Sequence, residues 1–134
     1  MFSAMLLTIS VVALSQFAAY YWRALVVGVA SSPVSERVLE AARVHDGKLT
    51  GQHFAVFAEL HDLTPDLQPG LKGLGLVRMY YRAVRSFGRI AGRFSVSLAA
   101  WTERELVLCA RYAAVQIDRR LQANLALAAS IRSC

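Results

Sequence analysis

The chain has 134 residues, a formal net charge of +6 and a hydrophobic content of 56%. This length suits one domain of modest size and excludes a second independent core, and the apolar content exceeds the ~45–50% usual in soluble domains. Its two cysteines, Cys109 and Cys134, are too few for a disulfide scaffold and indicate a reducing compartment.

The first thirty residues have the composition of a membrane-spanning helix. No charged side chain occurs from Met1 to Trp22, and ~20 apolar residues suffice to cross a hydrocarbon layer of ~30 Å. The run ends in an aromatic and basic belt of the kind found at headgroup level, where an arginine reaches outward to phosphate. This predicted membrane interface consists of Tyr20, Tyr21, Trp22 and Arg23.

A cleaved secretory signal is the alternative for this stretch, because Gly-Val-Ala at 28–30 resembles a small-residue cleavage site. The uncharged start, the length of the apolar run and the arginine before the supposed cut favour an anchor. Arg23, Arg37 and Arg43 follow the span, and no basic residue precedes it. Positive charge favours the cytoplasmic side, so we expect an inner (cytoplasmic) membrane protein with its N-terminus outside and its body in the cytoplasm.

Small side chains recur along one face of the predicted span. Helices in lipid associate by close backbone approach through small residues, so this face is a predicted packing surface for another span. Gln16 adds a polar group that favours a partner inside the membrane. A lone span that tolerates small residues is the alternative. The predicted packing face comprises Ala4, Thr8, Val11, Ser15, Gln16, Ala18 and Ala19.

Breaks divide the first part of the body into short elements. Ser-Ser-Pro at 31–33 combines a cap with a proline and predicts a helix over 33–45. A second helix is expected over 50–63, capped by Thr50, and a turn rich in proline and glycine follows over 64–70. The apolar ridge of the second helix comprises Phe54, Phe57 and Leu60.

The segment 74–94 is predicted to form a sharply amphipathic helix. Its five arginines fall within about 80° of arc, and an apolar face lies opposite. The longer stretch from Leu67 to Thr102 has six basic residues and no acidic one, so it accounts for the whole formal charge of +6. The predicted arginine stripe, with one lysine before it, comprises Lys72, Arg78, Arg82, Arg85, Arg89 and Arg93. The apolar face comprises Leu76, Tyr80, Ala83, Val84, Phe87, Ile90, Ala91 and Phe94.

The arginine stripe has three interpretations. A solvated bundle face is the simplest. The choice of arginine over lysine favours bidentate pairing with phosphate or carboxylate, which indicates either lipid headgroups or an acidic partner surface. No nucleic-acid recognition motif is present, so nucleic acid is not an expected partner. Gly88 and Gly92 beside the stripe predict the close approach of a neighbouring helix.

A long helix is expected over 95–132. Thr102 and Glu105 form a capping-box pattern, which predicts a break or fresh start near Trp101. Charged residues from Arg111 onward interrupt its apolar runs, so it is not a second span. Its apolar seam comprises Leu106, Ala110, Ala113, Ile117, Leu121, Asn124, Ala128 and Ile131.

Side chains that could carry chemistry are few. Three histidines recur at an even spacing of eight, near three carboxylates, but eight residues do not place ligands on one helix face. We expect cap and surface roles for them, and a buried inert thiol at Cys109. No phosphate-binding loop or nucleophile motif occurs. The three histidines are His45, His53 and His61, and the three carboxylates near them are Asp46, Glu59 and Asp62.

The sequence therefore predicts an all-α chain. One N-terminal transmembrane helix (1–30) precedes a small helical bundle (31–134) with a basic amphipathic helix and a long C-terminal helix. The expected function is a non-catalytic accessory or scaffolding subunit of a larger membrane complex. Its partners would be membrane lipids and other membrane subunits or a second copy, and no cofactor is expected.

Two alternatives remain open at this point. One is a membrane-anchored protein that binds a lipid, quinone or pigment between its Tyr80, Phe87 and Phe94 face and the C-terminal helix. The other is a metal-dependent enzyme that uses the central histidine, aspartate and glutamate side chains.

Overall fold

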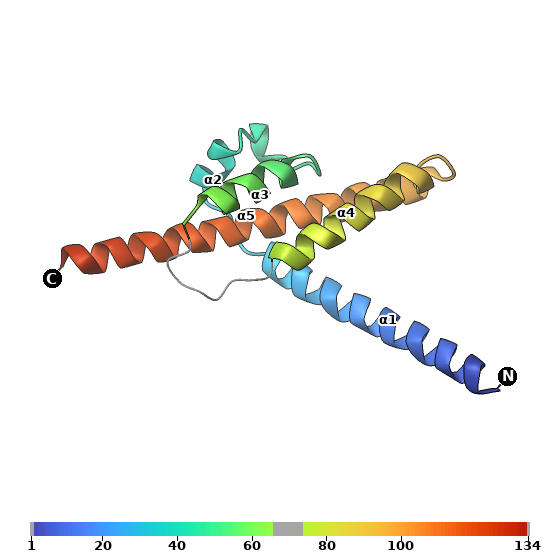
Figure 1. Ribbon diagram of the computed structural model, residues 1–134. Helices are drawn as coiled ribbons and strands as arrows, with labels where there is room; N and C mark the ends of the chain where they lie inside the picture. Colours follow the sequence, from blue (N-terminus) through green and yellow to red (C-terminus); the bar gives the residue numbers. More distant parts are fainter. Residues whose placement is uncertain (1, 66–73, 134) are drawn as a thin grey trace.

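A computed structural model of the chain describes residues 2–65 and 74–133. It confirms the all-α class, and the described residues contain no strand (Figure 1). The helices are α1 (Phe2–Ala30), α2 (Glu36–Ala41), α3 (His53–Leu63), α4 (Leu74–Ala91) and α5 (Val96–Arg132), with a short 3₁₀ turn η1 (His45–Gly47) after α2.

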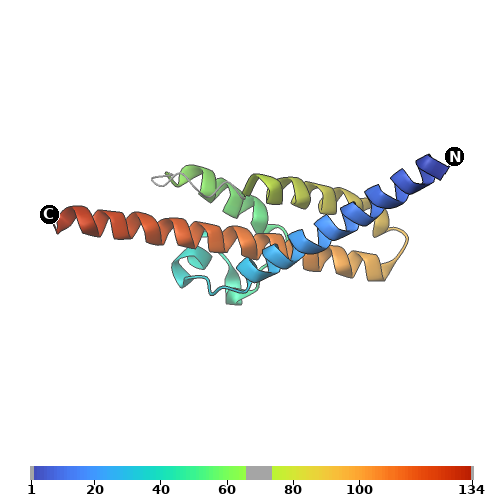
Figure 2. The same cartoon turned by 90° about the horizontal axis from the view of Figure 1, so that it is seen from below.

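Helix α5 is the axis of the body. Helices α1, α2, α3 and α4 all pack against it, on different sides (Figures 1 and 2). Residues 112–118 are consequently all buried, whereas an ordinary surface helix buries one face only. Beyond Arg120 the helix extends past the body. Leu121, Ala128 and Ile131 of its predicted seam are therefore exposed, whereas Asn124 is half-buried and donates a hydrogen bond to the Pro65 carbonyl. The core around α5 includes Val26, Phe57, Val77, Cys109, Ala113 and Ile117.

Two predicted helix starts are wrong. The backbone N–H groups of Ser31 and Ser32 bond to carbonyls of α1, so these serines finish α1 and do not cap the next helix. Helix α2 therefore begins only at Glu36, after an extended Ser35, and spans six residues. Helix α3 begins at His53 and not at Thr50.

The predicted break near Trp101 is also wrong, because α5 runs unbroken from Val96 to Arg132. No proline or glycine interrupts the segment, and the Thr102 hydroxyl bonds back to the Leu98 carbonyl at 2.8 Å as an interior residue would. Thr102 therefore does not cap a helix, and Glu105 is free to serve elsewhere.

Helices α4 and α5 approach closely at Gly88, which confirms the prediction for this glycine. A Cβ placed on Gly88 would lie 2.4 Å from the Thr102 Cγ2 atom. Glycine is therefore required here by the packing of the two helices, and any side chain would force them apart.

Replacing Gly88 with alanine is expected to lower the free energy of unfolding by about 1–3 kcal/mol, the cost of overpacking. Chemical denaturation in mild detergent, followed by far-UV circular dichroism, measures the loss. Gly75→Ala is the matched control, because nothing lies within 4 Å of the Cβ it would add. Equal stability of the two variants would show that α4 and α5 are less closely packed than described.

Candidate functional site

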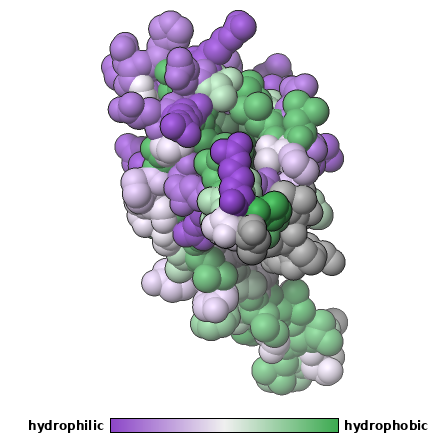
Figure 3. Space-filling view, turned by 90° about the vertical axis from the view of Figure 1, so that its left-hand side faces the viewer, coloured by the Kyte–Doolittle hydropathy of each residue, from purple (hydrophilic) through white to green (hydrophobic). Residues whose placement is uncertain are grey.

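Helix α1 is long and apolar enough to cross a membrane, and it lies near the N-terminus. Its most hydrophobic stretch has no residue buried against the body. The helix projects away from the other helices (Figure 1), and in the space-filling view its surface is predominantly apolar (Figure 3). The Thr8 hydroxyl donates to the Ala4 carbonyl and the Ser15 hydroxyl to that of Val12, so these polar groups are satisfied within the helix, as lipid requires.

The predicted packing face of α1 continues the face that holds the body. Trp22, Val26 and Ala30 contact or enter the core. At 3.6 residues per turn, these positions are in register with Ser15 and Ala18. The small side chains therefore lie on the same side of α1 as the core contacts, in the part of the helix that projects beyond the body. All seven residues of the predicted packing face are exposed.

The predicted interface belt divides into two parts. Tyr20 and Tyr21 are exposed, as a headgroup position requires. Trp22 packs against the core, and Arg23 turns inward to the body. The belt thus lies where the apolar helix ends and the packed body begins.

Glu105 joins three helices at this level. One of its carboxylate oxygens lies 2.7 Å from the Arg23 guanidinium of α1, and the other accepts a hydrogen bond of 2.9 Å from the Tyr80 hydroxyl of α4. Its side chain is only 2% exposed. Both oxygens are satisfied, which a buried carboxylate requires. We call these three residues the junction cluster.

Sequence reasoning assigned Glu105 to a cap and missed the junction cluster. A signal was present, since Glu105 is in helical register with Cys109 and Tyr112, both buried. An acidic residue on a buried helix face needs a cationic or hydrogen-bonding partner. Which residues supply it depends on how three distant segments pack.

Burial sets the acid–base properties near the cluster. Burial, reinforced by the charge of Glu105, raises the pKa of the Cys109 thiol from 9.0 to about 12. Burial also raises the pKa of Tyr80, and its hydrogen bond to Glu105 adds to the effect. Both groups are therefore neutral in the folded chain at physiological pH, and the thiol is inert as expected.

These shifts predict a loss of stability in alkali. Unfolded thiol ionises near pH 9, whereas folded thiol holds its proton to about pH 12, so the free energy of unfolding should fall as pH rises through this window. Denaturation midpoints measured from pH 7 to 11 test the trend. Cys109→Ala should flatten part of the fall, and an unchanged slope in that variant would contradict this assignment.

The arginine stripe is only partly free. The Arg78 guanidinium bonds to Asp62 at 2.6 Å and to the Ala58 carbonyl at 2.8 Å, so it holds α4 to α3. Arg82, Arg85 and Arg89 are exposed on α4. Arg93 lies in the turn after α4, because the helix ends at Ala91 and not at Phe94. Lys72 lies outside the described residues.

Most residues of the apolar face predicted for α4 are exposed, and the buried face of this helix lies beside it. Val84 is buried and Tyr80 packs against the core, but the other buried residues of α4 are Leu74, Val77 and Tyr81, one step around the helix. Tyr81 stacks on Phe54 of α3, with ring centroids 4.2 Å apart. Phe94 is exposed, and Phe87 is about half exposed with its ring against that of Trp101 on α5. Helix α4 therefore carries an exposed arginine flank and an exposed apolar flank on either side of its buried edge.

The histidines lie in separate environments. His45 is exposed in η1, and the His53 ring nitrogen accepts a hydrogen bond of 3.0 Å from the Thr50 backbone. Burial and the charge of Arg120 lower the pKa of His61, which lies beside Asp62. Within residues 2–65 and 74–133, no three histidine, cysteine, aspartate or glutamate side chains gather as metal ligands.

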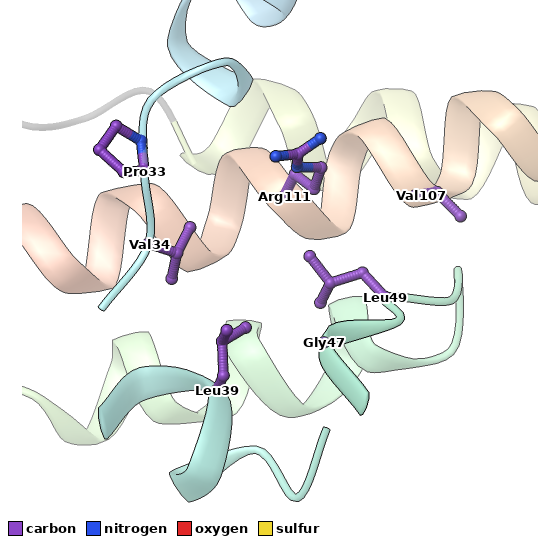
Figure 4. Close-up of a pocket in the computed structure, with 7 residues that line it drawn as sticks. All are labelled: Pro33, Val34, Leu39, Gly47, Leu49, Val107 and Arg111. Atoms are coloured by element: carbon purple, nitrogen blue, oxygen red, sulfur yellow. The ribbon is translucent and has the colours of Figure 1, made fainter. Parts of the chain in front are cut away.

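A cavity of about 420 Å³ lies between α5 and the segment 33–49, which follows α1 (Figure 4). Apolar side chains from the segment face it, and α5 contributes one guanidinium. This combination suits an apolar ligand that carries an acidic group. The cavity is lined by Pro33, Val34, Leu39, Gly47, Leu49, Val107 and Arg111.

The fold and these surfaces define the class of protein. Over the residues that the structure describes, it is an all-α chain with one helix able to span a membrane, joined to a helical body through a buried ionic cluster. No protein-family model matches the chain, and no curated protein or solved structure matches it either.

Proposed function

We propose that the chain is a non-catalytic, single-pass membrane protein that serves as an accessory or scaffolding subunit of a larger membrane complex. Helix α1 crosses the inner membrane with its N-terminus outside, and the body lies in the cytoplasm. Docking uses two surfaces, the small-residue face of α1 within the membrane and the free arginines of α4 on the body.

One observation carries this proposal. The face of α1 that packs on α5 continues outward as a row of small, exposed side chains. A helix that needed only to anchor the body would have no use for this registered face. A second span packed against it would bury the small residues and meet the body at the same time.

The arginine flank supports a second contact outside the membrane. Arg82 and Arg85 are exposed beside the groove between α3 and α4, which Glu59 and Asp62 of α3 also line. Helix α4 itself carries no acidic residue. Arginines so placed fit an acidic surface of a partner subunit, which would pair with their planar guanidinium groups.

Affinity purification in mild detergent tests the proposal. A fixed set of membrane subunits should accompany the chain. Ala18→Ile with Ala19→Ile should remove them, because the added side chains hold a partner helix away. Ala13→Ile with Ala24→Ile is the matched control, since it adds the same volume on the opposite face. Loss of the partners in both variants, or in neither, would contradict docking through the small-residue face.

Charge reversal tests the second surface. Arg82→Glu with Arg85→Glu should weaken the retained complex, while Arg37→Glu with Arg132→Glu, at exposed positions elsewhere, should not. If the stripe variant assembles and orients normally, these arginines are a solvated face and take no part in docking.

The cavity beside Arg111 favours a second candidate function, a membrane-anchored carrier of an apolar ligand with an acidic group. Such a protein should yield about one extractable ligand per chain. Leu39→Trp should fill the cavity and abolish recovery, whereas Leu63→Trp at an exposed site should not. A chain that yields no such ligand would contradict this candidate.

A further inference from the structure

The turn between α4 and α5 carries an unusual concentration of exposed apolar side chains. Phe94 is 83% exposed and Val96 is 87% exposed. Apolar side chains such as Leu63, Met79 and Ile131 are exposed elsewhere on the body, but six gathered around one turn indicate a surface that is covered in use. We call the patch the hairpin tip, and it comprises Phe87, Ile90, Phe94, Val96, Leu98 and Trp101.

The hairpin tip lies on the side of the molecule toward which α1 projects. Figures 1 and 2 both place the α4–α5 turn and the N-terminal end of α1 at the same end of the body, opposite the C-terminus. A bilayer crossed by α1 therefore lies on the side to which the turn extends.

The tip continues from the junction cluster. Trp101 lies one turn before Glu105 on α5, and Phe87 lies two turns after Tyr80 on α4. Their rings meet edge to face at a centroid distance of 6.3 Å. The apolar surface thus starts beside the Arg23–Glu105 ion pair, at the predicted membrane interface, and extends to the turn between α4 and α5.

The reach of the hairpin matches the headgroup layer. From Glu105 to Val96, α5 covers about 13 Å at 1.5 Å per residue. The hairpin and α1 diverge (Figure 1), so only part of this length is directed along α1. The headgroup region is roughly 5–8 Å deep on each side of the hydrocarbon. The tip would therefore enter this layer and stop short of the membrane centre.

The charges beside the tip fit an anionic lipid surface. Arg89 and Arg93 are exposed next to it, and no acidic residue occurs between Leu67 and Thr102. Basic residues that flank an exposed apolar surface are typical of elements that insert at a lipid interface.

We propose that the hairpin tip inserts into the headgroup layer of the membrane and forms a second lipid contact beside the span. The contact rests on the proposed membrane placement of α1 and not on the accessory-subunit role. It would fix the tilt of the body, because α1 and the hairpin tip together touch the bilayer at two separate places.

Site-directed fluorescence tests this contact on the full chain. In a Cys109→Ala, Cys134→Ser background, an environment-sensitive label is attached at Phe94→Cys, Ala128→Cys or Ile9→Cys. The chain is reconstituted in phosphatidylcholine vesicles with phosphatidylserine and with nitroxide lipids that quench at shallow or deep positions. Position 128 is the matched control, since it is exposed at the far end of α5.

The label at 94 should shift to shorter wavelength and lose at least half its emission to shallow nitroxides. The label at 128 should be unaffected, and the label at 9 should be quenched best by deep nitroxides. Arg89→Gln with Arg93→Gln should remove the part of the effect at 94 that depends on phosphatidylserine, and Arg132→Gln should not.

Three results would overturn the inference. A label at 94 that behaves like the one at 128, with position 9 still in lipid, removes the hairpin contact and leaves the span in place. A shift at 94 that ignores nitroxides and grows with protein density would indicate contact with a second copy. A label at 9 that escapes quenching would remove the anchor and the inference together.

Discussion

Replacing Arg23 with alanine should lower the free energy of unfolding by about 3 kcal/mol, because it leaves the Glu105 carboxylate buried without its cation. This is the low end of the ~3–5 kcal/mol found when a buried pair is broken. We expect the low end because the Arg23 side chain is 57% exposed and is already partly solvated. Denaturation in mild detergent, followed by circular dichroism, gives the value.

A double variant without either charge separates the buried charge from simple loss of contact. Arg23→Met with Glu105→Leu should be much more stable than Arg23→Ala, since neither charge remains to be buried. Arg104→Ala, at an exposed position of α5, is the control and should change stability by less than about 0.5 kcal/mol. An Arg23→Ala chain as stable as this control would show that the Glu105 carboxylate does not depend on the Arg23 guanidinium for its stabilisation.

The junction cluster also bears on the proposed role. It ties α1 to α4 and α5, so we expect it to help hold the small-residue face and the arginine flank in one arrangement. Loss of the Arg23–Glu105 pair should therefore weaken partner capture more than the change in stability alone would suggest.

Placing aspartates at Ile9 and Val12 should remove the chain from the membrane. A central aspartate costs roughly 2.5–3.5 kcal/mol on insertion, so two lower the equilibrium constant for insertion by about a thousandfold or more. The fraction of protein in the membrane pellet after a high-salt wash measures the effect. Val56→Asp with Leu63→Asp, at exposed positions of α3, is the matched control and should leave that fraction unchanged. A pelleted Ile9→Asp, Val12→Asp chain would contradict the placement of this segment in lipid.

The features predicted best were those with long or repeated patterns. An uncharged apolar run identified α1, and helical periodicity identified α5. The ridge of Phe54 and Phe57 is buried as expected. These signals lie within single helices, where the chain itself sets the geometry.

The missed features depend on contacts between distant segments. The Ser31 and Ser32 backbone N–H groups donate to carbonyls of α1, so α2 begins later than predicted, although the local sequence resembles a helix cap. Glu105 matches a capping box locally, but its partners come from positions 23 and 80. The buried edge of α4 was misplaced because apolar residues cover more of that helix than α3 and α5 can bury.

Extraction of native membranes with alkaline carbonate tests the central claim most directly. The treatment releases proteins held only at the membrane surface, whereas a helix that crosses the hydrocarbon stays with the lipid. We expect the full chain to remain in the pellet and to be released only by detergent. Its recovery in the supernatant as a monodisperse particle in plain buffer would contradict the account.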